Sequence, residues 1–454
     1  MDIRGRHTKR YTFRSPDVKR LRELASLVKN PLDFAKRYGN LLTLLNTDVD
    51  EGLLKTFVQF YDPVFRCFTF PDYQLLPTLE EYAHTLGIVI SDRMPFNGLE
   101  AIPRSQDISV LLHIRKSEID KNLRTKKGIL GLTSRFLLER AFTFAEAGRR
   151  LASENILALL IYGLMLFPNI GNFVDINAMR IFKIKNPVPT LLGDTYFSIH
   201  HRHRQGGGEI VCCAPLLHRW IVSHLPKSPI FQRNKKEWQW SRRFMSLTHK
   251  DIHWYTLADN EMEIIESCGE FANVPLMGTQ GGINYNPVLA KRQLGYANSE
   301  KPIGFTTESY CYCEGADPQG LKDKMIRAWL CIRRMKRGNA KNCVAKENYT
   351  AWVKKRAEEF RMPYVLEKPM FPTVKKPTTL GKYKEALIKL KQEKDALKRK
   401  FLTTSAENDR LKEQVKDQET TLNFQDEWLI KKDEALKRKR KFDELTKETP
   451  TLDK

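Results

Sequence analysis

The sequence predicts a mainly α protein, with a multi-helix globular domain that contains a few short strands and is followed by a C-terminal coiled coil. Three observations support this. Apolar residues recur at helical spacing through most of the first 362 residues, alternation typical of a strand is brief, and a heptad pattern begins after a segment rich in Pro, Lys and Thr. We expect a basic N-terminal arm at 1–16, a helical body at 17–362, a linker at 363–379, a coiled coil at 380–436 and a basic tail at 437–454.

The stretch 57–90 has the strongest local signal. Aromatic residues crowd its first half and predict a short strand at 65–70. Thr78 and Glu81 have the spacing of a capping box, and Gly87 is placed to end the helix that they start. Four apolar residues then share one helix face: Leu79, Tyr82, Ala83 and Leu86. We interpret this stretch as a buried nucleus without chemistry of its own.

Helical spacing also predicts the other elements. Helices are expected at 17–28, 31–38, 50–61, 175–184, 191–203, 214–224, 320–335 and 346–361, and a loop at 91–107. The segment 134–167 predicts two long helices with a break near 149–153. The second is apolar on nearly every face, so we expect it at the centre of the body.

The heptads beyond the linker form two sets of seam positions. The seam residues are Leu380, Leu387, Phe401, Asn408 and Val415 in one set, and Tyr383, Leu390, Leu397 and Leu411 in the other. A polar Asn408 in the seam favours one register, most simply that of a parallel dimer. The alternative is a single charged helix stabilised by pairs four residues apart.

The net charge of +23 and the pI near 9.6 favour polyanionic partners. Residues 375–454 contain 22 basic and 16 acidic residues, so most of the excess belongs to the body. The unbroken run Lys437, Arg438, Lys439, Arg440 and Lys441 predicts a nuclear-import signal, with a solvated helix end as the alternative.

Aromatic and basic residues alternate in one segment that we predict to contact nucleic acid. Its residues are Arg233, Lys235, Lys236, Trp238, Trp240, Arg242 and Arg243. Flat rings can stack on bases while the cations meet phosphates. The alternative is that the tryptophans anchor the core and their basic neighbours face water.

No segment predicts a catalytic, cofactor or metal site. His200, His201 and His203 precede Cys212 and Cys213, but no CxxC pair occurs and adjacent helical side chains diverge. Walker, dinucleotide-binding, GxSxG and HExxH motifs are also missing from the sequence. We therefore expect no enzyme and no cofactor, and we expect the eight cysteines to be reduced thiols.

The chain opens without a secretory signal, and its most apolar run, 156–167, is too short to cross a bilayer. We therefore expect no membrane association. A nuclear location is favoured, with the cytoplasm as the alternative.

Residues 68–88, FTFPDYQLLPTLEEYAHTLGI, resemble the signature of the plant mobile domain, also labelled aminotransferase-like. The segments at 158–172, 192–196 and 214–220 follow in the family's order, and GGINYNP at 281–287 resembles a loop of an uncharacterised plant branch related to maintenance-of-meristems-like proteins. Tyr82 and the segment 223–270 depart from the family pattern. The resemblance implies a mostly helical domain that is carried by transposable elements and by nuclear host proteins derived from them.

Together these observations predict a non-enzymatic, transposon-derived nuclear protein that associates with DNA, RNA or chromatin in silencing or genome maintenance. One alternative is a protein-interaction scaffold that pairs through its coiled coil as a homodimer or with a partner coil. A second alternative is an accessory factor of a transposable element.

Overall fold

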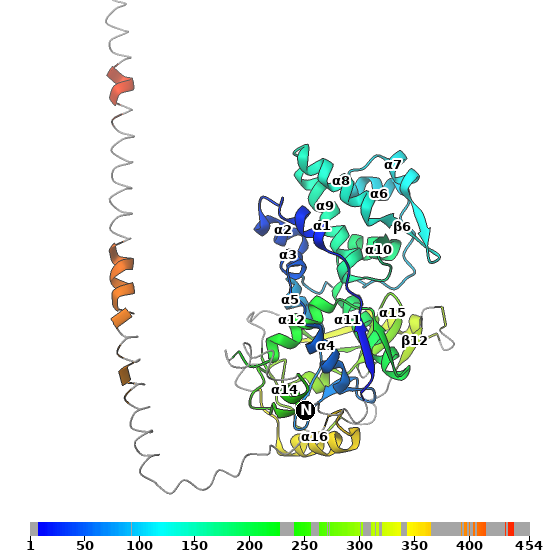
Figure 1. The fold of residues 1–454 in the computed structure, drawn as a ribbon, viewed down its shortest axis with the longest axis vertical. Helices are drawn as coiled ribbons and strands as arrows, with labels where there is room; N and C mark the ends of the chain where they lie inside the picture. The colour runs from blue at the N-terminus through cyan, green and yellow to red at the C-terminus, as the bar shows by residue number, and fades with distance from the viewer. Residues whose placement is uncertain are drawn as a thin grey trace, which may run out of the picture. The chain divides into compact units, whose positions relative to one another are not determined.

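The computed structural model describes residues 8–91, 93–227, 240–255, 263–269, 271, 273–299, 301–302, 310–313, 315–316, 320–336 and 343–364, and scattered helical residues between 392 and 439. The chain divides into two units, residues 1–369 and 370–454. The first unit is the body, and its elements are shown in Figure 1.

The body is mainly helical, as predicted. Its α-helices are α1 (Lys19–Ala25), α2 (Pro31–Tyr38), α3 (Leu41–Leu45), α4 (Glu51–Phe57), α5 (Leu79–Leu86), α6 (Ser105–Leu112), α7 (Lys116–Asn122), α8 (Ser134–Glu146), α9 (Arg150–Ile161), α10 (Ile176–Ile184), α11 (Val188–Arg204), α12 (Ala214–His224), α14 (Trp240–Ser246), α15 (Leu321–Trp329) and α16 (Glu347–Phe360). Shorter helical turns are η1 (Val58–Phe60), the π-helical η2 (Tyr162–Leu166) and η3 (Pro287–Ala290).

The strands form small sheets. They are β1 (Arg10–Phe13), β2 (Tyr61–Asp62), β3 (Cys67–Thr69), β4 (Gln74–Leu75), β5 (Arg124–Lys126), β6 (Ile129–Thr133), β7 (Phe173–Asp175), β8 (Gly207–Ile210), β9 (Glu263–Cys268), β10 (Val274–Met277), β11 (Gly281–Tyr285), β12 (Cys311–Cys313) and β13 (Ile332–Lys336). The sheet orders are β2-β3-β4, β5-β6-β7, β10-β11-β12, β13-β9 and β1-β8. Among these described strands the pair β1-β8 is parallel and the other pairs are antiparallel.

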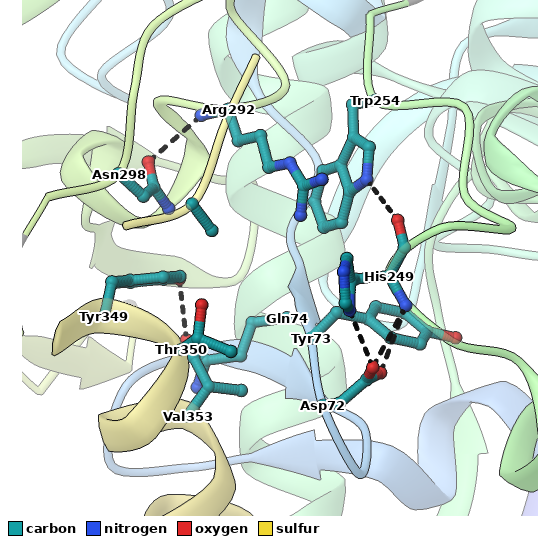
Figure 2. Close-up of a pocket in the computed structure, with 11 residues that line it drawn as sticks. Asp72, Tyr73, Gln74, His249, Trp254, Arg292, Asn298, Tyr349, Thr350 and Val353 are labelled. Carbon is teal, nitrogen blue, oxygen red and sulfur yellow. Dashed lines mark hydrogen bonds and ion pairs between the residues drawn. The ribbon is translucent and has the colours of Figure 1, made fainter. Parts of the chain in front are cut away.

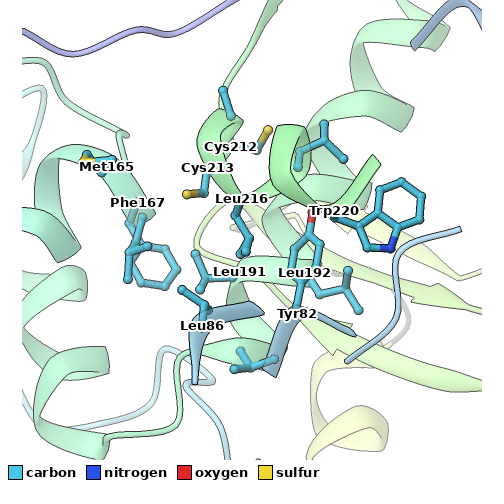
Figure 3. Packing of buried hydrophobic residues seen from close by; sticks show 14 of the residues in the cluster. Tyr82, Leu86, Met165, Phe167, Leu191, Leu192, Cys212, Cys213, Leu216 and Trp220 are labelled. Carbon is cyan, nitrogen blue, oxygen red and sulfur yellow. The ribbon is translucent and has the colours of Figure 1, made fainter. Parts of the chain in front are cut away.

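Helix α5 forms as its sequence predicts. The Thr78 hydroxyl accepts the Glu81 backbone N–H at 3.2 Å, and the Glu81 carboxylate accepts the Thr78 N–H at 3.2 Å. Gly87 ends the helix in the left-handed conformation with φ of 63°. The face of Leu79, Tyr82 and Leu86 is completely buried, and Figure 3 shows Tyr82 and Leu86 among core residues of α11 and α12.

The two long helices predicted within 134–167 are also confirmed. They are α8 and α9, joined by a tight turn, and α9 continues into the π-helical turn η2. From Ile156 to Ile161 every side chain of α9 is buried, which agrees with its apolar composition. Gly163 lets this helix approach β7, because a Cβ there would lie 2.7 Å from the Val174 side chain.

Three local predictions are wrong. Residues 10–13 of the expected N-terminal arm form β1, which pairs with β8 and buries Tyr11 and Phe13. The helix expected at 320–335 ends at Trp329, and its last residues become β13, which pairs with β9. The loop expected at 91–107 ends early, since α6 starts at Ser105. In addition, α6, α7 and the β5–β6 hairpin have no counterpart among the predicted elements.

The second unit is helical at the residues that the structure describes, which include 406–414 and 435–439. Two seam residues, Asn408 and Leu411, fall in this part, and Leu411 is 54% exposed. The other seam residues lie outside the described residues. Coiled-coil pairing therefore stays a prediction.

Candidate nucleic-acid interface

Cations from three distant parts of the chain meet where β1 pairs with β8. We call this the basic surface and define it by Lys9, Arg10, Arg14, Lys126, Lys127, Arg202 and Arg204, together with the carboxylate of Glu209. Strand β1 and its flanks bring the first three residues, the hairpin β5–β6 brings the lysines, and the end of α11 brings the last two arginines.

The glycine run before β8 has a structural cause. Gly207 has a φ of 137°, a conformation that side chains disfavour, and a Cβ there would lie 2.5 Å from the Arg10 carbonyl oxygen. Glycine at this position therefore allows β8 to lie beside β1. Lys9 is fixed by hydrogen bonds, since its backbone and the Gln59 side-chain amide exchange two of them, each of 2.9 Å.

The C-terminal end of α11 attracts positive charge. The Lys9 ammonium donates to the His203 carbonyl oxygen at 2.7 Å, an arrangement that the helix dipole favours. The Arg202 Nε donates to the Glu209 carbonyl oxygen at 2.8 Å and so joins the end of α11 to β8. Arg204, in the last helical turn, is exposed.

The histidines of α11 contribute little charge at neutral pH. Burial, followed by the charge of Lys9, lowers the pKa of His203 to about 4. Burial, followed by the charge of Arg66, lowers the pKa of His200 to about 3. The positive potential of this region therefore comes from lysine and arginine.

The hairpin β5–β6 presents its lysines at a tight turn. Lys127 and Gly128 have φ of 51° and 78°, which are the two left-handed residues of a type I′ hairpin turn. All three residues of β5 are exposed, and the Lys126 ammonium donates to the Gly171 carbonyl oxygen at 2.7 Å.

Glu209 is the carboxylate on which three of these cations act. A hydrogen bond from Arg14 lowers the pKa of Glu209, and the charges of Arg14, Arg202 and Lys127 lower it further. Glu209 is therefore ionised at neutral pH and neutralises part of the charge of Arg14. The cations around it still outnumber it, which leaves a surface suited to phosphate groups.

The predicted nucleic-acid segment is only partly exposed. Arg233, Lys235, Lys236 and Trp238 lie outside the described residues. Trp240 is half-buried, and its indole N–H donates to Asp50 Oδ2 at 3.0 Å. The Arg243 guanidinium lies over the Trp240 ring, 4.5 Å from its centroid, and is buried. The prediction is therefore wrong for Arg243, because a buried guanidinium cannot contact a phosphate. Arg242 is exposed, and its contact with nucleic acid stays a prediction.

The predicted import run lies in the second unit. Lys437, Arg438 and Lys439 are helical and exposed, while Arg440 and Lys441 lie outside the described residues. Exposure suits both the import signal and its alternative, a solvated helix end.

A buried polar cluster centres on Glu81. His224 Nε2 lies 3.0 Å from Glu81 Oε1, and the other carboxylate oxygen accepts the Trp220 indole N–H at 2.9 Å. The Gln293 amide donates to Oε1 at 3.0 Å. His224 and Trp220 are as buried as Glu81, so this acid–histidine pair meets no solvent and joins α5 to α12 and to the segment after η3. The sequence signalled Glu81 as a cap but gave no signal for its partners.

A small cavity lies beside the turn between β3 and β4, and Figure 2 shows its lining. His249 Nδ1 lies 2.8 Å from Asp72 Oδ2, and the Arg292 guanidinium lies over the Trp254 ring, 3.8 Å from the centroid. The cavity volume is about 10 Å³, about enough for one water molecule. We interpret this site as packing, not as a ligand site.

The described residues offer no grouping of three His, Cys, Asp or Glu side chains that could hold a metal ion. Cys212 and Cys213, which the sequence placed near a histidine cluster, are buried thiols, and burial raises the pKa of both. In the described part of the chain every helix is too short or too polar to cross a bilayer.

These features define a mainly helical protein in which a buried acid–histidine cluster joins α5 to α12 and a cationic surface faces solvent. Its family model is described as Domain of unknown function (DUF7745) and matches residues 21–358, so the chain belongs to that family. No curated protein and no solved structure matches it.

Proposed function

We propose that this protein is a non-enzymatic nuclear protein that binds nucleic acid through the basic surface. The observation that carries the proposal is the cluster of cations where β1 pairs with β8: Arg14, Arg202 and Lys127 act on the Glu209 carboxylate, and Lys9 binds the end of α11. The fold fixes the backbone positions of these cations, which lowers the cost of arranging them against phosphates.

The resemblance to the plant mobile domain supports a nuclear, transposon-derived role, and we propose silencing or genome maintenance as its setting. The signature segment forms α5 and the strands before it, which lie in the core. The resemblance therefore concerns the residues that form the core of the fold. The proposed contact with nucleic acid is made by the basic surface, which consists of other residues.

Filter binding of the full-length chain to duplex DNA, duplex RNA and single strands tests the proposal. We expect submicromolar retention at low salt that weakens steeply as salt rises. Negligible retention of every nucleic acid at low salt would overturn it.

A second candidate function, a scaffold that dimerises through the C-terminal helix, is favoured by the exposure of Leu411 and Leu436. Apolar side chains on an otherwise charged helix are stabilised when a partner helix covers them. The two functions are compatible, because dimerisation would double the number of basic surfaces.

A further inference from the structure

The hairpin β5–β6 differs from the rest of the basic surface because its strand β5 is open on both faces. Arg124 and Lys126 point to one face of β5 and Thr125 to the other, and all three are exposed. Strand β5 is an edge of the sheet β5-β6-β7, and Figure 1 shows the hairpin, in cyan, at the periphery of the body. A Cβ added at Gly128, in the turn, would meet no atom within 4 Å. A large ligand can therefore reach the end of the hairpin from both sides.

The base of the hairpin is held by the body. Strand β6 pairs with β7 from Gly131 to Thr133, and Leu132 between them is buried. A Cβ at Gly131 would lie 2.3 Å from the Val174 carbonyl oxygen, so glycine allows this close approach of the two strands. The hairpin therefore presents its side chains from a fixed backbone, which lowers the cost of ordering them on a ligand.

The charge of the hairpin is positive throughout. Between residues 124 and 133 it contains three cations, Arg124, Lys126 and Lys127, and no carboxylate. Lys127 acts on the Glu209 carboxylate, which places the turn of the hairpin near β8 and therefore near the cations of β1 and α11. A polyanion that receives the hairpin can thus contact these other cations at the same time.

The described elements that form the basic surface expose no phenylalanine, tyrosine or tryptophan ring. Tyr11 and Phe13 of β1 are buried, as are Tyr196 and Phe197 of α11. Strands β5, β6 and β8 contain no such residue. Proteins that bind single-stranded nucleic acid usually stack the bases on aromatic side chains. The composition of this surface therefore favours a duplex, whose bases are already stacked.

The dimensions of a two-stranded ribbon distinguish between the two kinds of duplex. The major groove of B-form DNA is about 12 Å wide and admits such a ribbon. The major groove of A-form RNA is too narrow and deep for side chains to read. An exposed, cationic hairpin therefore fits B-form DNA better than duplex RNA.

We propose that the β5–β6 hairpin enters the major groove of B-form DNA while the cations of β1 and α11 contact phosphates beside that groove. This inference rests on the proposed function and names duplex DNA as its ligand. Inside the groove, the lysine and arginine side chains of the hairpin donate to guanine O6 and N7, and the cations outside it fix the position of the protein on the backbone.

Three duplexes of one sequence, each of about 20 base pairs or two helical turns, test the proposal by filter binding to the full-length chain. They are plain DNA, DNA with glucosylated 5-hydroxymethylcytosine, and RNA. The glucosyl groups fill the major groove but leave the number of phosphates unchanged. The glucosylated DNA and the RNA should each bind at least about tenfold more weakly than plain DNA.

The other outcomes separate this proposal from the proposed function. Equal binding of plain and glucosylated DNA, or RNA binding as tight as that of plain DNA, would overturn entry into the major groove and leave nucleic-acid binding standing. Retention of none of the three duplexes, nor of single strands, would overturn both.

Two variants locate the contact. Arg124→Gln/Lys127→Asn should bind plain DNA more weakly and should lose most of the preference for plain over glucosylated DNA; asparagine before Gly128 suits the type I′ turn. The matched control Arg10→Gln/Arg204→Gln also removes two cations, but it should weaken both DNAs equally and keep the preference. All four side chains are exposed, so both variants should stay folded, which a thermal melt checks. A hairpin variant that keeps the full preference would overturn the proposal.

Discussion

Glu81 Oε1 lies 3.0 Å from His224 Nε2, and both side chains are shielded from water. His224 Nδ1 lies 2.7 Å from the His253 carbonyl oxygen, which can only accept, so Nδ1 carries a proton. His224 is thereby held between this carbonyl oxygen and the Glu81 carboxylate. The pair links the helix with the clearest sequence signal to a helix more than 130 residues later.

Glu81→Gln should destabilise the body by about 3–5 kcal/mol, because it removes the carboxylate from a buried acid–histidine pair that is shielded from water. Urea unfolding at neutral pH measures the change. Glu139→Gln is the control: Glu139 is exposed and its loss should cost under about 1 kcal/mol. Equal stabilities of the two variants would show that the pair contributes little.

The same pair predicts acid sensitivity. Burial alone would raise the pKa of Glu81, but the charge of His224 and the hydrogen bonds of three neighbours outweigh it, so the pKa is lowered. A carboxyl group with a lowered pKa stabilises the fold above its unfolded pKa of about 4.3, and this contribution is lost as pH falls through the folded pKa. The stability of Glu81→Gln should therefore depend less on pH below about 4.5 than that of the unaltered protein, as acid titration of urea midpoints would measure. Identical acid profiles of the two proteins would contradict this prediction.

Glu80 should have the opposite effect of Glu81 on the pH dependence of stability. Burial raises its pKa to about 7, against a lowering hydrogen bond from the Ile265 N–H. The folded state then holds a proton that the unfolded state releases, so stability falls as pH rises from about 4 to 7. Glu80→Gln should reduce the loss of stability between pH 5 and pH 8, followed by urea unfolding, by about 2 kcal/mol. An unchanged loss would show that Glu80 is already ionised in the folded protein at pH 5.

Leu79→Asp or Leu86→Asp should unfold the body at 25 °C, since each would bury an unpaired carboxylate in the core. Circular dichroism with thermal melting detects the loss. His84→Asp places the same side chain on the exposed side of α5 and should leave the protein folded. A folded Leu79→Asp protein would mean that α5 is a surface helix.

Leu411→Asp should convert a dimeric full-length chain into a monomer, because it places charge in the predicted seam. Light scattering after size-exclusion chromatography measures the mass. Ala406→Asp lies in the same helix outside the seam and should remain dimeric. A monomeric unaltered chain at micromolar concentration would remove the coiled-coil prediction.

Local sequence signals predicted α5, α9 and α12 well, because a capping box, an apolar run and helical spacing act within one element. The basic surface could not be predicted in this way. Its cations are brought together only by the pairing of β1 with β8, whose residues are almost 200 positions apart. Long-range contacts also decide the surroundings of Trp240, which is half-buried and donates a hydrogen bond to Asp50, a partner that its local sequence does not indicate.

The residues 332–336 show a limit of periodicity. Five residues are too few to separate helix from strand by spacing, and pairing with β9 decides in favour of a strand. The three glycines at 206–208 likewise indicate only a turn when the sequence is read locally. The close approach of Gly207 to Arg10 becomes evident only in the folded chain.

The salt dependence of nucleic-acid binding tests the central claim most directly. The variant Arg10→Glu/Lys127→Glu/Arg204→Glu removes three exposed cations of the basic surface, and Lys19→Glu/Lys354→Glu/Lys355→Glu makes the same charge change elsewhere on the body. In a plot of log affinity against log salt, the first variant should lower the slope for duplex DNA by about 2 to 3 and weaken binding at least tenfold, while the second stays near the unaltered protein. Equal slopes and affinities for the two variants would contradict the assignment of this surface.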